Sequence, residues 1–127
     1  MDSSGFDFSR FDVNGDYVID VTAVLHSGYA AEYGGSDCNT GATSLDRIQS
    51  FASSATYNTW VSTSGYSLGN FFITSGLEGL CNFVPAKVGT MIHEFLHTFG
   101  LPDLYDKRGK YNNNPSSVGG IAGYDVM

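Results

Sequence analysis

Two histidines four residues apart constrain this chain more than any other feature. The segment 93–103 reads H-E-x-x-H-x-x-G-x-x-D, a pattern typical of zinc sites built on a helix. At about 3.6 residues per turn, His93 and His97 lie about 40° apart on one helix face, so both imidazoles can reach one ion. Glu94 is adjacent, and Gly100 is suited to turn the chain so that Asp103 approaches the same ion. The spacing predicts zinc ligands His93, His97 and Asp103, with Glu94 placed to move a proton.

The residues around this motif have the apolar periodicity of a helix. One face carries the aliphatic and aromatic positions Val84, Val88, Met91, Ile92, Phe95 and Phe99. The motif histidines fall on the opposite side, which is not where a core histidine is expected. Pro85 is expected in the first helical turn, where its missing N–H costs nothing. The alternative is a surface helix with incidental histidines, but two of the three histidines of the chain are in this motif.

Three segments resemble the immune-inhibitor-A-like metallopeptidases, a family of the metzincin group of zinc endopeptidases. Residues 89–106 resemble the active-site region, and residues 6–34 are similar to an upstream strand and glycine turn. Residues 123–127 look like the methionine turn, in which Met127 would lie beneath the zinc. The resemblance implies an α+β, zincin/metzincin-like fold. In that fold a small twisted mixed sheet packs on the active-site helix and loops are long.

The resemblance also implies how the chain is organised. Residues 1–127 are expected to form a partial metallopeptidase catalytic domain. Its upper subdomain would run to about Gly100, and its lower subdomain would begin in residues 101–127 and be truncated at the methionine turn. The composition agrees with one small, loop-rich domain, because the chain has 127 residues, 16 glycines and only 15% charged residues.

The function implied by the resemblance is that of a secreted zinc endopeptidase, which we expect to be a monomer. Zn²⁺ would acidify a water, and Glu94 would be the general base that helps it attack a peptide bond of a protein or peptide substrate. The alternative is a catalytically inactive adhesion or binding module of the same fold that keeps the metal for stability.

Composition and charge exclude two classes of partner. The net charge is −7, and no cluster of lysine and arginine is present to neutralise phosphates. We therefore expect no nucleic-acid partner. No apolar run approaches the roughly 20 residues of a membrane helix, so no membrane span is expected.

The segment 12–20 has the oxygen spacing of a calcium loop. Its candidate ligands are the side chains of Asp12, Asn14, Asp16 and Asp20 and the carbonyl of Val18. Tyr17 occupies a position that favours glycine, and Ala23 stands where a glutamate closes such loops. Ca²⁺ would then take a further ligand from Asp7, Glu32 or water. The alternative is an Asx-rich turn that leads into a strand, without a metal.

The two cysteines, Cys38 and Cys81, leave two alternatives. They form a disulfide, which would contribute about 4 kcal/mol on the chain-entropy model, or they are two free buried thiols. The secretion implied by the family resemblance favours the disulfide.

The remaining chain can be assigned only coarsely. Strands are expected at residues 17–26 and 70–74, which are rich in β-branched and aromatic residues. Ser44 is expected to cap a short helix that includes Phe51, and residues 76–83 and 107–120 are expected to be loops. His26, at the end of the first strand, is expected to be structural.

Overall fold

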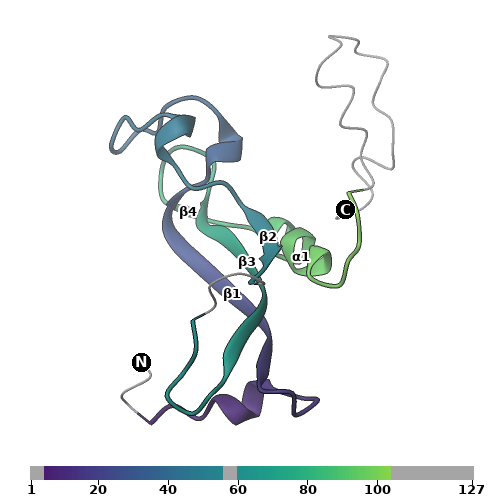
Figure 1. Cartoon of the computed structure of the whole chain (residues 1–127). Helices are drawn as coiled ribbons and strands as arrows, with labels where there is room; N and C mark the ends of the chain where they lie inside the picture. The colour runs from purple at the N-terminus through teal and green to yellow at the C-terminus, as the bar shows by residue number, and fades with distance from the viewer. Residues whose placement is uncertain (1–4, 56–59, 104–127) are drawn as a thin grey trace.

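The computed structural model describes residues 5–55 and 60–103 (Figure 1). They form a mixed α+β structure with a four-stranded sheet and one α-helix. In the sheet, β3 (Ser67–Glu78) pairs in parallel with β1 (Val18–Tyr29) and antiparallel with β2 (Phe51–Ser54). The short β4 (Val84–Pro85) pairs with the end of β3, and α1 (Val88–His97) follows it. The residues 107–120 lie outside the described residues.

The two expected strands are present, and each is longer than its sequence pattern indicates. Strands β1 and β3 have 12 residues each, and their register runs from Val18 opposite Ser67 to Tyr29 opposite Leu77. Serine and glycine at both ends of β3 have low strand propensity, which is why the pattern ended early. The paired neighbour strand supplies the backbone hydrogen bonds that extend β3 beyond its apolar centre.

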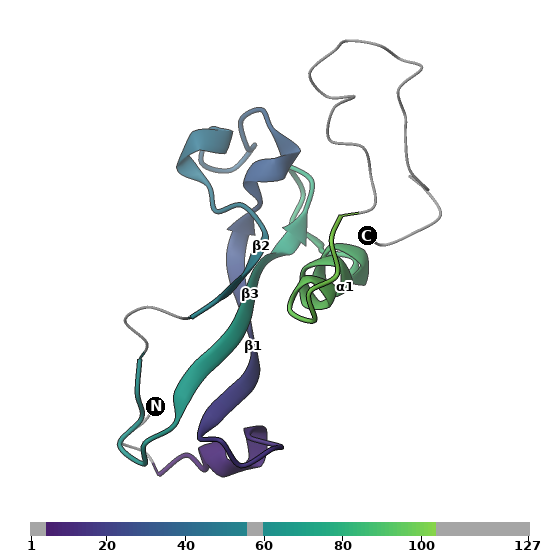
Figure 2. The same ribbon diagram turned by 45° about the vertical axis from the view of Figure 1, so that its right-hand side comes forward.

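The helix α1 packs on the face of the sheet formed by β2 and β3. Figures 1 and 2 show it beside these two strands, with β1 on the far side of β3. Phe95 meets Phe72 edge to face at a ring-centroid distance of 6.1 Å. Asn70 donates a hydrogen bond of 3.0 Å to the carbonyl of Thr98, which is one of the carbonyls left unpaired at the helix end. These contacts fix α1 over the middle of β3.

The start of α1 differs from the expectation. Val84 and Pro85 form β4, with Pro85 opposite Leu77 and Val84 opposite Glu78, and the helix begins only at Val88. The prediction of Pro85 in the first helical turn is therefore wrong. A proline is also tolerated in a short edge strand, because its missing N–H can face away from the ladder.

Residues 30–50 form a connecting lobe at the carboxyl end of β1 (Figure 2). Cys38 and Cys81 form the disulfide that joins this lobe to the turn after β3. The buried carboxylate of Asp37 accepts hydrogen bonds from the backbone N–H groups of Asn39 and Thr40 and from the Thr40 hydroxyl. The Thr40 hydrogen bonds are the main reason that the pKa of Asp37 lies below its usual value.

The helix expected after Ser44 is a single turn, η4 (Ser44–Asp46). Its N-cap is Thr43, not Ser44, and Thr43 and Asp46 form a capping box. Phe51, expected in that helix, instead pairs with Ile73 in β2. The helical spacing of the apolar residues was outweighed here by pairing with β3.

We expect Gly69→Ala to destabilise the fold, because β1 and β3 approach closely at this position. A Cβ at residue 69 would lie 2.8 Å from the Ile19 carbonyl oxygen and 2.9 Å from a Val18 methyl carbon. Overpacking of this kind typically costs about 1–3 kcal/mol in the free energy of unfolding, measured by urea denaturation.

Gly89→Ala is the matched control for this substitution. A Cβ at Gly89, within α1, meets nothing within 4 Å, and alanine favours helix by about 1 kcal/mol over glycine. Equal unfolding free energies for the two variants would contradict the close approach of β1 and β3.

Candidate metal centre

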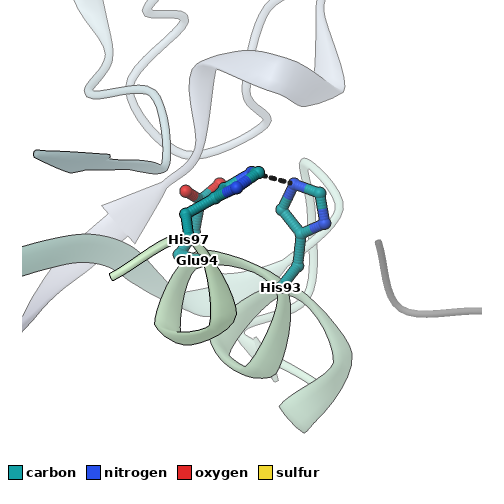
Figure 3. A group of neighbouring side chains, drawn as sticks. All are labelled: His93, Glu94 and His97. Carbon is teal, nitrogen blue, oxygen red and sulfur yellow. Dashed lines mark hydrogen bonds between the residues drawn. The ribbon is translucent and has the colours of Figure 1, made fainter. Parts of the chain in front are cut away.

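The helix α1 brings the two motif histidines together. The Nε2 atoms of His93 and His97 are 3.1 Å apart, and the ring planes are inclined by 80°. Figure 3 shows both rings and the Glu94 side chain projecting from the same side of the helix. Their potential ligand atoms all lie within 4.8 Å of one another. One helical turn therefore places three polar side chains around a common point.

The chain after α1 turns so that Asp103 reaches the same point. Gly100 adopts a φ of 80° and donates a backbone hydrogen bond of 2.9 Å to the carbonyl of His97. This left-handed conformation is readily adopted by glycine and is common just past a helix. The Asp103 Oδ1 atom then lies 3.2 Å from Nε2 of His93 and 3.0 Å from Nε2 of His97.

The same turn orients one of the imidazoles. Nδ1 of His97 is 2.7 Å from the carbonyl oxygen of Leu101, so Nδ1 carries the proton and donates a hydrogen bond to that oxygen. The lone pair of the ring is then on Nε2, the atom that faces His93 and Asp103. Such a hydrogen bond, donated by the second ring nitrogen, is usual for a metal-bound histidine.

The donor set fits a zinc ion. A tetrahedral zinc with bonds of about 2.0–2.1 Å keeps its ligand atoms about 3.3 Å apart. The three separations among the two Nε2 atoms and Oδ1 of Asp103 are 3.1, 3.2 and 3.0 Å, slightly shorter than that spacing. Two imidazoles and a carboxylate are ligand types that zinc accepts. Expansion by a few tenths of an ångström would accommodate the ion without a change of side-chain direction.

Glu94 is buried beside these ligands, with 7% of its surface exposed. Burial raises the pKa of Glu94 above its usual value, and the charges of Glu32 and Asp103 add to this effect. The two histidines act in the opposite direction and lower it. Glu94 therefore holds a proton more readily than an exposed glutamate does. Within α1, Glu94 is the residue that is buried, whereas Phe95 on the apolar stripe is 38% exposed.

Glu32 is a neighbour of the centre that the sequence pattern did not identify. It lies in η3 (Ala31–Tyr33), just after β1, and its charge acts on Glu94. Its carboxylate accepts hydrogen bonds from the backbone N–H and hydroxyl of Ser50. The sequence separates Glu32 from the metal motif by about sixty positions and gives no periodicity that links them. In the sequence alone, Glu32 stands out only as a possible calcium ligand.

The segment 12–20 folds as a series of Asx turns. Asp12 accepts hydrogen bonds from the backbone N–H groups of Gly15, Asp16 and Tyr17, and Asp20 accepts one from Val13. Tyr17 has a φ of 65°, the left-handed conformation expected at the glycine position of a calcium loop. This geometry is compatible with a calcium loop and with a metal-free Asx-rich turn, so both alternatives stay predictions.

Glu32 and His26 are two further candidate metal ligands in the sequence. Glu32 lies at the opposite end of the 12-residue β1 from this loop, so it does not supply the missing calcium ligand. His26 lies within β1 and is not part of the group formed by the motif residues. The methionine-turn residue Met127 lies outside the described residues.

Comparison with known proteins agrees with this geometry. The family model of the immune inhibitor A peptidase M6 catalytic domain matches residues 2–123. No curated protein matches the chain at a significant level. The M6 peptidases are zinc-dependent, and the His93, Glu94 and His97 group is consistent with their zinc site. The family implies a zincin-like fold and protein substrates, and together with the disulfide it suggests an extracellular location.

No helix among the described residues has the length and hydropathy of a membrane span. The chain belongs to the immune inhibitor A family of M6 peptidases, and its matching region is the catalytic domain.

Proposed function

We propose that this chain is the catalytic core of a secreted zinc endopeptidase, with His93, His97 and Asp103 as the zinc ligands. The observation that carries the proposal is the convergence of two Nε2 atoms and one carboxylate oxygen at separations of 3.0 to 3.2 Å. Family membership supports the same reaction class. A purely structural use of the motif would not explain why a glutamate is buried next to it.

In this proposal each side chain has a distinct role. A bound zinc ion would supply Lewis-acid chemistry, acidifying water and polarising the scissile carbonyl. Glu94 would accept the proton of the attacking water and pass it to the leaving amine. The pKa of Glu94, raised by burial, is closer to the operating pH than that of an exposed glutamate, which suits a group that both takes and gives a proton.

The sheet offers a place for an extended substrate. Among the described residues the strand order is β1–β3–β2, so β2 is the last strand there, and it lies beside α1 (Figure 1). An edge strand presents unpaired N–H and C=O groups to which an extended peptide can add by backbone hydrogen bonds. A peptide lying along β2 would pass the metal ligands on α1. This mode accommodates many sequences, because backbone groups supply the hydrogen bonds.

Asp103→Ala is expected to weaken zinc binding, because it removes one of three ligands. The loss should exceed the 10–100-fold change typical when only a hydrogen-bond partner of a ligand is lost. Competition with a chromogenic chelator measures the affinity. Glu78→Ala, which removes a carboxylate paired with Lys87 away from the centre, is the control. Equal zinc affinity in both variants would remove Asp103 from the ligand set.

Glu94→Gln tests whether the centre is catalytic. The glutamine keeps the size of the side chain but cannot accept the proton, so peptide cleavage should fall by about 10²–10⁴-fold. Zinc content, measured by elemental analysis, should remain near one ion per chain. If wild type and Glu94→Gln behave alike in cleavage while both hold zinc, the chain is the inactive binding module and not a peptidase.

Calcium binding is tested separately from zinc. If the loop 12–20 binds Ca²⁺, titration with calcium should raise the melting temperature in a saturable way, because a ligand that binds only the folded state stabilises it. Asp16→Ala should abolish this rise. A melting temperature that calcium does not change would establish the metal-free Asx turn.

A further inference from the structure

Within the connecting lobe, the Glu32 carboxylate binds Ser50, which leads into the edge strand β2. The Glu32 Oε1 atom accepts a hydrogen bond of 2.6 Å from the Ser50 hydroxyl, and Oε2 accepts one of 3.2 Å from the Ser50 N–H. Ser50 is the residue immediately before β2. Both donors of one residue thus bind both oxygens of one carboxylate, and hydrogen bonds to a charged group are about twice as strong as neutral ones.

These hydrogen bonds continue into the centre of the sheet. The Ser50 hydroxyl is also 3.4 Å from the hydroxyl of Thr74 in β3. Ser50 and Thr74 are 6% and 2% exposed, so the connection is shielded from water. Polar groups paired in such surroundings interact more strongly and tolerate little displacement. Close by, the backbone N–H of Ala31 donates to the carbonyl of Ile48, which makes a second connection between η3 and the segment before β2.

This connection lies on the part of the sheet that α1 packs against. Phe51, the residue after Ser50, pairs with Ile73 of β3, so Ser50 lies beside Thr74 at the start of β2. On the α1 face of β3, Thr74 is two residues from Phe72, the residue that Phe95 of α1 contacts. The start of β2 is therefore held beside the part of α1 that carries the motif. Among the described residues, β2 has four residues and pairs on one side only, so the hydrogen bonds of Ser50 add to the pairing of Phe51 with Ile73 at the start of the strand.

We propose that Glu32 is a positioning residue that holds the start of β2 in register with the metal centre, so that an extended peptide can add to this edge. The inference rests on the proposed function, because it assigns a role to the substrate edge of the same site. Glu32 acts through Ser50 and does not contact the reacting atoms. Its removal should weaken the binding of peptides that extend along β2 and should leave zinc binding unchanged, whereas any effect of the lost charge on Glu94 should be the same for short and long peptides.

The test compares Glu32→Ala with wild type on two blocked peptides that share one central sequence. The long peptide has eight residues, and the short one has only the residues on either side of the scissile bond. For the long peptide KM should rise about tenfold, the effect of losing roughly one hydrogen bond to a charged group, with zinc content unchanged and any change in kcat equal for the two peptides. For the short peptide KM should remain within about twofold of wild type.

Three further variants separate positioning from a general loss of stability. Glu32→Gln keeps an acceptor oxygen and should restore part of the long-peptide affinity. Ser50→Ala removes only the hydroxyl donor and should give a smaller rise in KM in the same direction. Glu78→Ala, which removes a half-buried carboxylate at the end of β3, beyond its pairing with β2, should behave as wild type. A proportional loss of activity on both peptides, with a lower melting temperature and no rescue by glutamine, would overturn the positioning role.

Peptide binding to the zinc-loaded chain distinguishes failure of this inference from failure of the proposed function. In the Glu94→Gln background, calorimetry should show that adding Glu32→Ala weakens the long peptide about tenfold and the short peptide little. If this holds but wild type does not cleave, the peptidase proposal fails and the role of Glu32 stands. If wild type cleaves but Glu32→Ala leaves the ratio of the KM values for the long and short peptides unchanged, only the role of Glu32 is overturned. Absence of length-dependent binding also overturns it.

Discussion

The turn that follows α1 is the constraint on which the metal centre depends. A helix can direct two imidazoles at one ion, because residues four apart share a face. In this chain the third ligand comes from beyond the end of α1. Gly100, in the left-handed conformation, reverses the chain within three residues and returns Asp103 to both Nε2 atoms. The same turn places the carbonyl of Leu101 where it accepts the proton of His97 Nδ1. One backbone conformation thus determines both the ligand count and the orientation of one ligand.

The centre also depends on a change from apolar to polar contacts along β3. At Phe72 the sheet is apolar and receives Phe95, which anchors α1. One pleat further along, at Thr74, it is polar and leads through Ser50 to Glu32. The apolar contact at Phe72 therefore holds α1 on the sheet, although part of the apolar face of α1 is exposed. The same helix carries the buried carboxylate of Glu94. The cost of burying Glu94 is visible as its raised pKa, and neighbouring histidines offset part of that cost.

The sequence predicted the site better than it predicted the sheet, and the reason is the range of the interactions. His93, Glu94 and His97 belong to one helical turn, so their spacing alone determines their proximity. The ends of β1 and β3 depend on pairing between segments about fifty residues apart, and the pattern gave only their centres. Phe51 fitted a helical periodicity and yet pairs with Ile73, because a long-range partner outweighs a weak local preference. Glu32 could not be found at all, since its partner Ser50 is defined only by the fold.

The lobe between β1 and β2 is attached to the rest of the structure at two points. Its first residues carry Glu32, and its last residue is Ser50, so the carboxylate closes the lobe at its base. At its far side the Cys38–Cys81 disulfide and a hydrogen bond of 2.9 Å from Cys38 N–H to the Leu80 carbonyl join it to the turn that leads into β4 and α1. The lobe is therefore fixed both to the edge strand and to the approach of the helix. A covalent bond and a charge-assisted hydrogen bond thus act at different points of the lobe, so loss of either one leaves the other attachment in place.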